Sequence, residues 1–215
     1  MEIKLRCEQT KDYRETETVT REAFWNHYAP GCFEHYLVHV MRDSPAFLPG
    51  LAFVALDGDK IIGNVMCVKS IIQGDDGKAC EVLTLGPISV LPEYQKKGIG
   101  CRMLRQVRAK ACKMGYRAIL LYGDPDYYTK QGFVPAENYN IRTADNMYAA
   151  ALQVCELRVH ALEGVQGRFI EDTVYDISET KAEAFDRQFP FKEKCSGTPS
   201  QQKFEKIVRM RRKAD

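Results

Sequence analysis

The stretch from Leu85 to Tyr116 constrains the fold more than any other part of the chain. It begins with an apolar run typical of a strand, breaks at Pro92, and passes through the loop segment Gln95-Lys-Lys-Gly98-Ile-Gly100. Beyond the loop, apolar residues recur at the spacing of a helix, at Leu104, Val107, Ala111 and Met114. The pattern therefore predicts a strand, a loop and a helix in direct succession.

The loop between this strand and this helix combines three features that favour an anionic ligand. Gly98 and Gly100 allow backbone N–H groups to approach a ligand closely, because glycine has no Cβ. A helix N-terminus adds unpaired donors and a partial positive charge. Lys96 and Lys97 add two full charges. The features predict a phosphate or diphosphate site, although a tight turn with solvated lysines accounts for the two glycines equally well.

Two other phosphate-binding patterns fit the loop less well. A dinucleotide-binding loop needs a third glycine where this chain has Met103, and its first turn is tighter than the present loop. The P-loop pattern, Gly-x-x-x-x-Gly-Lys-Ser/Thr, does not occur in the sequence. A nucleotide-binding oxidoreductase therefore stays open as the less favoured alternative.

Two spaced motifs resemble those of the GNAT family, the Gcn5-related N-acetyltransferases. The segment from Gln95 to Gly100 is similar to the family's Gln/Arg-x-x-Gly-x-Gly/Ala at a helix start. Tyr128-Thr-Lys-Gln-Gly132-Phe133 is similar to the family's Tyr-x-x-x-Gly-Phe and follows at the usual distance. The segment Gly123-Asp-Pro-Asp-Tyr-Tyr128 resembles one bacterial branch of the family. The likeness extends from Ile3 to Tyr175.

The resemblance implies an α/β protein with the GNAT acyl-CoA N-acyltransferase fold. In that fold a mixed central sheet of about six to seven strands carries helices on both faces and is splayed between strands four and five. Here Gly86-Pro87 predicts the splay, because glycine suits a bulge and proline cannot donate to a strand ladder. The GNAT domain is expected over residues 1–175, followed by a helical and linker extension over residues 176–215.

Patterns elsewhere in the chain predict further strands and helices. The expected strands are Ile3–Cys7, Leu51–Leu56, Lys60–Ile71, Cys80–Val90 and Arg117–Tyr122. The expected helices are Thr10–Trp25, Gly31–Met41, Glu179–Gln188 and Gln201–Arg212. The segment from Asn146 to Leu162 is rich in Ala, Leu and Val, and its pattern does not decide between strand and helix.

Composition favours a globular protein of the cytoplasm. The 215 residues are 45% hydrophobic and 28% charged, and the net charge of +2 gives no reason to expect nucleic acid or a membrane as partner. No apolar run approaches the ~20 residues that span a bilayer, and the first residues lack an apolar signal segment. The eight cysteines form no Cys-x-x-Cys pair and no cluster with histidine, so we expect reduced thiols and no metal.

The resemblance also assigns a cosubstrate, acetyl-CoA, and the residues that bind it. Its diphosphate is expected on the loop, its pantetheine arm on the splayed strand, and further contacts just before and within the second motif. The corresponding residues are Gln95, Lys96, Lys97, Gly98, Ile99 and Gly100; Ile88, Ser89 and Val90; and Asp124 and Tyr127.

The same resemblance places the chemistry at Tyr128. The leaving thiolate is like that of cysteine, with a parent pKa of about 8.5, so a neutral donor with a pKa near 10 can protonate it. Tyr128 matches the family's general acid, and Tyr127 is the neighbouring alternative. Glu81 is the expected general base, with Glu34 and His35 as rivals. A water chain without any single base is also open.

The acceptor is expected to be a primary amine on a small molecule or peptide, which attacks acetyl-CoA directly in a ternary complex. The aromatic connection from Phe24 to Gly31 corresponds to a segment that walls the acceptor site in GNAT proteins. Trp25, Asn26, Glu34 and His35 are therefore the candidate substrate contacts. The alternative is a non-catalytic, CoA-binding regulatory module on the same fold. Family members are often homodimers.

Overall fold

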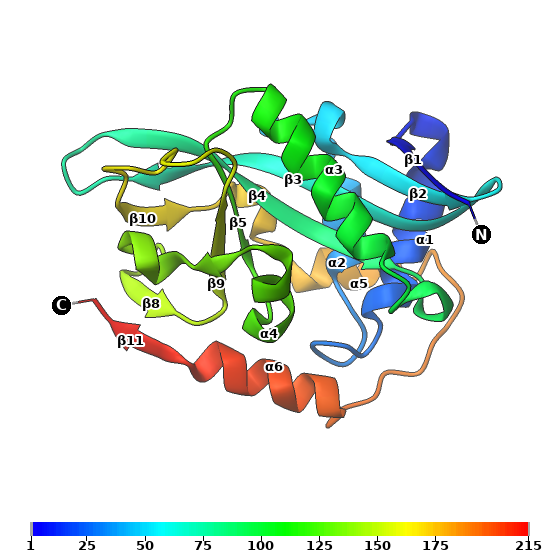
Figure 1. Ribbon diagram of the computed structural model, residues 1–215. Coiled ribbons are helices and arrows are strands. Elements are labelled where there is room, and N and C mark those ends of the chain that lie inside the picture. The colour runs from blue at the N-terminus through cyan, green and yellow to red at the C-terminus, as the bar shows by residue number, and fades with distance from the viewer. Residues whose placement is uncertain (1, 215) are drawn as a thin grey trace. The chain divides into compact units, whose positions relative to one another are not determined.

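The computed structural model of the protein describes residues 2–214 and divides into two compact units (Figure 1). Unit 1 comprises Met1–Cys67, Gly86–Val107 and Thr173–Gln202, and unit 2 comprises Val68–Leu85, Arg108–Asp172 and Lys203–Asp215. Strands β3 (Lys60–Gln73) and β4 (Ala79–Val90) and helix α3 (Ile99–Lys113) contribute residues to both units. The residues expected to form a C-terminal extension are likewise divided between them.

Unit 1 begins with three antiparallel strands. β1 (Ile3–Cys7) pairs with β2 (Phe53–Asp57), and β2 pairs with the first part of β3 across a turn from Asp57 to Lys60. The register shifts between Ala55 and Leu56, opposite Gly63. β2 starts two residues later than its pattern predicted, because Pro49–Leu51 form a 3-10 turn, η2.

The helices of unit 1 follow the predicted pattern with small changes at their ends. The first predicted helix is a 3-10 turn, η1 (Thr10–Asp12), followed by α1 (Tyr13–Phe24); the others are α2 (Glu34–Met41) and α5 (Glu179–Asp186). The side chain of Ser178 caps α5 by accepting a hydrogen bond from the Lys181 amide. Apolar side chains on these helices are buried, among them Val19, Val38, Met41 and Ala182.

In unit 2, β4 and its neighbour in the sheet form a short parallel ladder. β4 and β5 (Ala118–Tyr122) pair in parallel at Leu83–Ile119 and Thr84–Leu120, and at no further position in residues 2–214. Both strands nevertheless continue, β4 through Gly86 at a φ of 139°. The short ladder agrees with the splay that Gly86-Pro87 predicted.

The remaining strands of unit 2 are short. β5 pairs antiparallel with β9 (Leu152–Glu156), β9 pairs with β6 (Val134–Pro135), and β10 (Gly167–Ile170) pairs with the end of β3 and with β7 (Ile141–Arg142). Across the described residues the main sheet has nine strands, in the order β1-β2-β3-β4-β5-β9-β6, with β10 and β7 off this path. The expected strand number was too low because a strand such as β7 has only two residues, too few to give an alternating pattern.

The C-terminal residues differ from their predicted form. Helix α6 (Pro199–Arg209) ends before Met210, and Arg211–Lys213 form a strand, β11, beside β8 (Met147–Ala149) (Figure 1). The prediction of a helix through Arg212 was therefore wrong at its end, because pairing with a distant strand replaces the last helical turn. None of the helices in residues 2–214 is both long and apolar enough to cross a membrane.

Candidate active site

The loop before α3 presents backbone donors that the rest of the described chain does not use. Lys96 and Gly98 have φ angles of 60° and 78°, in the left-handed region, which glycine adopts freely and lysine at a cost. Within residues 2–214 the amides of Lys96, Lys97 and Gly98 donate to no other group. The first amides of α3, from Ile99, have no partner within the helix. Unpaired donors thus gather at the positive end of the helix dipole, where an anion is stabilised.

The two lysines of this loop have different surroundings. The Lys97 ammonium donates to the Glu93 carbonyl at 2.8 Å and lies 5.1 Å from the centre of the Tyr94 ring. Lys96 is exposed and makes no hydrogen bond or ion pair with any described residue. Gln95 Nε2 donates to the Val90 carbonyl at 3.0 Å and ties the loop to the end of β4. Lys96 is therefore the lysine free to reach a ligand, whereas Lys97 and Gln95 support the loop.

Contacts that no sequence motif predicted stabilise the end of β4. Ser89 is buried, and its hydroxyl donates to that of Thr20 at 3.2 Å, so only its backbone is available to a ligand. A Cβ on Gly63 would lie 2.7 Å from the Ser89 carbonyl oxygen, which explains why glycine stands there. The Tyr175 hydroxyl donates to the Gly86 carbonyl at 2.9 Å. Ile88 and Val90, the other two predicted contacts, are half-buried.

In unit 2, the Tyr128 ring packs against residues that are close to it in sequence. Tyr128 ends helix α4 (Pro125–Tyr128), and its ring centre lies 5.5 Å from that of Phe133 and 5.0 Å from that of Tyr127, edge-on to both. A Cβ on Gly123 would lie 2.3 Å from the Tyr128 ring, so the ring occupies the space that glycine leaves. Tyr128 is half-buried, whereas Tyr127 is 40% exposed.

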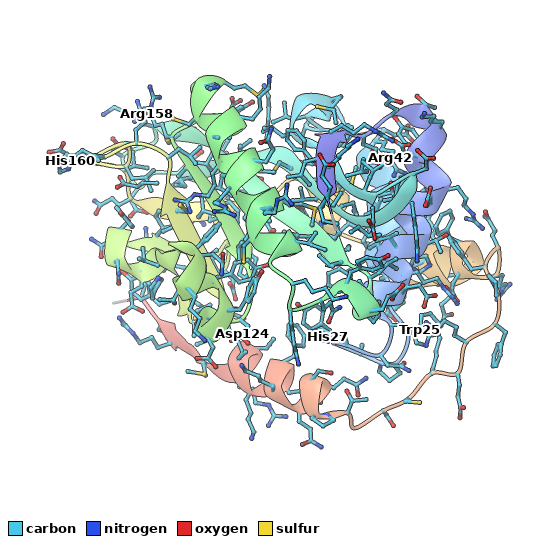
Figure 2. The ribbon with its side chains drawn as sticks, turned by 45° about the vertical axis from the view of Figure 1, so that its right-hand side comes forward. Trp25, His27, Arg42, Asp124, Arg158 and His160 are labelled. Atoms are coloured by element: carbon cyan, nitrogen blue, oxygen red, sulfur yellow. The ribbon has the colours of Figure 1, made fainter. Side chains whose placement is uncertain are left out.

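Asp124 holds the start of α4 and is itself held by the C-terminal helix. Its Oδ1 accepts from the Asp126 amide at 3.0 Å, and its carbonyl accepts from the Tyr128 amide at 3.0 Å. Its Oδ2 accepts from the Lys203 ammonium at 2.6 Å (Asp124 is labelled in Figure 2). Both carboxylate oxygens of this predicted cofactor contact are thus engaged within the chain. Sequence patterns did not predict the contact between Lys203 and Asp124, because the two residues are 79 positions apart.

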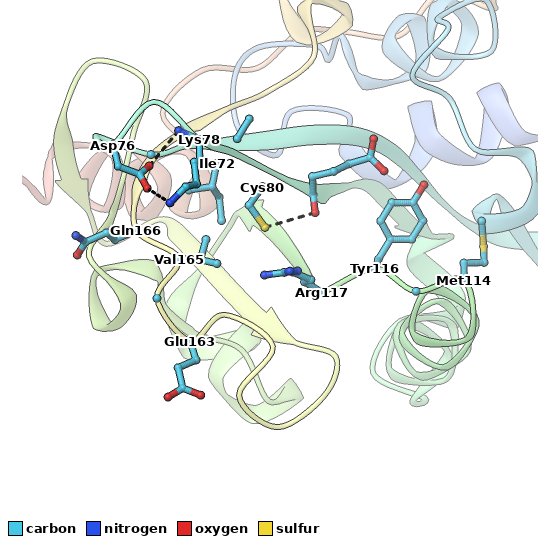
Figure 3. Close-up of a pocket in the computed structure, with 15 residues that line it drawn as sticks. Ile72, Asp76, Lys78, Cys80, Met114, Tyr116, Arg117, Glu163, Val165 and Gln166 are labelled. Atoms are coloured by element: carbon cyan, nitrogen blue, oxygen red, sulfur yellow. Dashed lines mark hydrogen bonds and ion pairs between the residues drawn. The ribbon is translucent and has the colours of Figure 1, made fainter.

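Glu81 and Tyr128 lie at opposite ends of the parallel strands. The Glu81 carboxylate is 55% exposed, lies 3.5 Å from the Lys69 ammonium, and lines a cavity of about 560 Å³ together with Cys80, Arg117 and Glu163 (Figure 3). The cavity is at the amino ends of the parallel strands β4 and β5, whereas Tyr128 follows the carboxyl end of β5. A five-residue strand such as β5 spans about 16 Å. The structure therefore does not bring Glu81 and Tyr128 together.

Trp25 and Asn26 are bound to the C-terminal segment of unit 1. The Trp25 indole N–H and the Asn26 side-chain amide both donate to the Glu193 carbonyl, at 2.9 and 3.1 Å. Asn26 Oδ1 accepts from the amides of Gly31 at 2.8 Å and Cys195 at 3.0 Å. Asn26 also has a φ of 58°, a conformation that asparagine tolerates better than most residues. The polar groups of these two predicted substrate contacts thus hold the connection between α1 and α2 (Trp25 is labelled in Figure 2).

Glu34 and His35 are engaged inside unit 1. His35 is fully buried, with its Nε2 3.0 Å from Asp186 Oδ1, a close contact without the alignment of a hydrogen bond. Burial lowers the pKa of His35 to about 4, so its ring is neutral at neutral pH. Glu34 accepts a hydrogen bond from the Phe33 amide at 3.0 Å, and burial raises the pKa of its carboxyl. An acceptor would not reach His35 in this arrangement.

Comparisons with known proteins agree with this fold and these motifs. A protein-family model described as an acetyltransferase (GNAT) domain matches residues 49–135, a range that includes both motifs. The uncharacterized N-acetyltransferase YhbS of Escherichia coli is 30% identical over 135 residues, which are 62% of this chain and 78% of YhbS.

Two solved structures are similar to the present one. The crystal structure of Escherichia coli YhbS in complex with CoA has a TM-score of 0.72 at 24% identity, and the match covers 81% of this chain and 92% of YhbS. A GNAT family acetyltransferase from Brucella melitensis, in complex with acetyl-CoA, has a TM-score of 0.65 at 25% identity. That match covers 81% of this chain and 99% of the Brucella protein.

Proposed function

Because this chain belongs to the GNAT family of N-acetyltransferases, we propose that it transfers an acetyl group from acetyl-CoA to a primary amine by direct attack. The observation that carries this proposal is the loop from Lys96 to Gly98, whose unused amides precede the N-terminus of α3. The structures of YhbS with CoA and of the Brucella protein with acetyl-CoA support the choice of cosubstrate.

In this proposal the loop grips the diphosphate of coenzyme A. The amides of residues 96–100 supply hydrogen bonds to the phosphate oxygens, and the Lys96 ammonium supplies a charge that no described residue neutralises. The pantetheine arm lies along the backbone of Ile88, Ser89 and Val90. An amide of this strand then stabilises the oxyanion that forms when the amine attacks the thioester carbonyl.

Tyr128 is the proposed general acid. The thioester is already activated, so the protein needs to position the amine, stabilise the oxyanion and protonate the leaving thiolate. A tyrosine hydroxyl donates one proton to the thiolate sulfur as the carbon–sulfur bond breaks. The packing of the Tyr128 ring on Phe133 and against Gly123 supports this role, because it fixes the direction of the hydroxyl.

No single carboxylate is assigned as the base. Glu81 lies at the end of the strands opposite to Tyr128, and Glu34 and His35 contact their own neighbours. We therefore propose that the attacking ammonium loses its proton through water. The acceptor is a primary amine on a small molecule or peptide, as the family implies.

Thiol release from acetyl-CoA in the presence of a panel of primary amines tests the proposed function, with calorimetric titration of coenzyme A beside it. Binding together with amine-dependent thiol release supports the transferase. Binding without release by any amine would indicate a CoA-binding module instead. No binding heat and no thermal protection by coenzyme A would reject the proposed site.

A further inference from the structure

We propose that Lys203 is a positioning residue, which holds helix α4 in place and thereby orients Tyr128. The proposal rests on the function proposed above for Tyr128. Lys203 Nζ lies 2.6 Å from Asp124 Oδ2 and 2.9 Å from Asp126 Oδ2, so one ammonium bridges the two carboxylates that flank Pro125. The Asp124 and Asp126 carboxylates raise the pKa of Lys203, and the Lys203 ammonium lowers the pKa of Asp126. These directions favour the charged forms that the bridge requires.

Helix α4 depends on contacts outside itself. It has four residues, and a helix of one turn does not form alone, because nucleation costs more than a single turn returns. Its amide donors at Tyr127 and Tyr128 both reach the Asp124 carbonyl, at 3.1 and 3.0 Å. Asp124 also caps the Asp126 amide. Whatever orients Asp124 therefore orients the backbone of Tyr128.

The far end of the same segment is held by helix α3. Tyr128 is followed by the 3-10 turn η4 (Thr129–Gln131), which ends at Gly132 with a φ of 81°. Arg108 Nη1 donates to the Gln131 carbonyl at 2.7 Å and fixes this end. The start of the segment has no such contact from α3 among the interactions of Asp124 and Asp126, and Lys203 supplies the anchor there.

The C-terminal residues keep Lys203 near α4 independently of its own ion pairs. Beyond α6, β11 forms a ladder with β8, in which Arg211 pairs with Ala149 (Figure 1). Arg211 Nη2 lies 2.6 Å from Asp145 Oδ1, and Arg212 forms an ion pair with Glu137. Because the backbone of this segment is already ordered, the chain loses less conformational entropy when the Lys203 side chain bridges the two carboxylates. The tail thus supplies a preorganised ammonium.

The expected effect is local, because the bridge is exposed. The side chains of Lys203, Asp124 and Asp126 are 50%, 33% and 77% exposed, and exposed ion pairs contribute little to global stability. A short surface segment, however, opens at a small cost in free energy, so a modest loss changes how often it is ordered. Removal of the Lys203 charge should therefore loosen α4 and leave the melting temperature nearly unchanged.

Hydrogen exchange of residues 124–131 and steady-state kinetics test the inference on the full chain. In Lys203→Met, exchange in this segment should rise several-fold, and kcat should fall roughly threefold to tenfold with a smaller change in KM for acetyl-CoA. Lys206→Met is the matched control, because Lys206 is exposed on the same helix and forms no ion pair with a described residue. Lys203→Arg should restore both values, since guanidinium can bridge the same carboxylates.

Either unchanged exchange in residues 124–131 or unchanged kcat in Lys203→Met would overturn the inference. The exchange measurement needs no turnover, so it stands apart from the proposed function. If Tyr128→Phe kept full activity, the role of Tyr128 would fail. The exchange of α4 in Lys203→Met would still report whether Lys203 holds the helix.

Discussion

Tyr127 and Tyr128 are adjacent in the chain, but their tertiary contacts differ. Tyr127 is 40% exposed, whereas the Tyr128 ring packs edge-on to Phe133 and fills the space beside Gly123. A hydroxyl that donates a proton in a transition state must be held in one direction, and packing of the ring does this. At the scale of single residues, the contacts therefore favour Tyr128 over its neighbour.

Tyr128→Phe removes this hydroxyl and keeps the ring. We expect kcat to fall more than about tenfold, because a positioned general acid contributes at least that much. The Kd of acetyl-CoA should change little, since the loop contacts remain. Tyr127→Phe is the control and should keep most activity. Steady-state kinetics and calorimetry measure the two constants, and equal kcat values for both variants would contradict the assignment.

His35 gives a prediction about pH. Burial lowers its pKa to about 4, from an ordinary 6.5, and outweighs the opposing effect of the Asp186 and Glu17 carboxylates. Between these pH values the unfolded chain binds a proton that the folded chain does not. The free energy of unfolding therefore falls as the pH drops from 6.5 towards 4 and is level above 6.5. The loss from this group is on the order of 3 kcal/mol at most.

Thermal unfolding at about pH 7 and about pH 4.5 measures this loss. His35→Gln should lose less stability between the two pH values than the unchanged protein, because its side chain does not titrate. An equal loss in His35→Gln and the unchanged protein would rule out His35 as the source.

At the scale of elements, the loop and the start of α3 act together. The amides of Lys96 to Gly98 are unused in the described chain, and the helix dipole adds positive potential at the same end. Lys96 and Gly98 both have left-handed backbone conformations, which interrupt regular backbone hydrogen bonding in the loop. Lysine adopts this conformation only at a cost in free energy. A strained non-glycine conformation of this kind is often kept for function.

Gly98→Ala should weaken coenzyme A binding. A Cβ at Gly98 meets nothing within 4 Å in the protein, so the methyl group would occupy the open space before the loop, and the φ of 78° would be strained. We expect the Kd of coenzyme A to rise about tenfold. Gly77→Ala carries a similar strain, at a φ of 84° in the β3–β4 turn, and should leave the Kd unchanged. Calorimetry compares the two, and equal Kd values would remove the loop from the binding site.

At the scale of the whole molecule, the C-terminal segment contributes to both units. Residues 173–202 belong to unit 1, where they bind the α1–α2 connection, and residues from 203 onward belong to unit 2, where they bind α4 and β8. The tail is therefore part of each unit's structure. Several hydrogen bonds of residues 173–202 are made to Asn26.

Asn26→Gly separates a structural from a substrate-binding role. Glycine keeps the φ of 58° but loses the side-chain bonds to Glu193, Gly31 and Cys195. We expect a loss of about 1–3 kcal/mol in the free energy of unfolding, with faster hydrogen exchange in residues 193–201. Asn146→Gly, at a φ of 62° and without a side-chain hydrogen bond to a described residue, is the control. A fall in activity with unchanged stability would favour the substrate role instead.

The sequence by itself determined the strand–loop–helix unit, the splay after Gly86 and the motif from Gly123 to Phe133 that contains Tyr128. These features depend on neighbours: glycine and proline act on their own backbone, and Tyr128, Gly123 and Phe133 lie within eleven positions of one another. Local spacing therefore carries the information. The same local signals failed at β7, which is too short to show a period, and at the end of α6.

Only the tertiary structure decided which distant groups meet. Lys203 and Asp124 are 79 positions apart, and Trp25 and Glu193 are 168 positions apart. The burial of His35 likewise depends on packing, and the position of Glu81 at the amino end of β4 depends on strand direction. Helix and strand periodicity states which face of an element is apolar, but not which segment will cover it. That choice comes from the free energy of the whole packed chain.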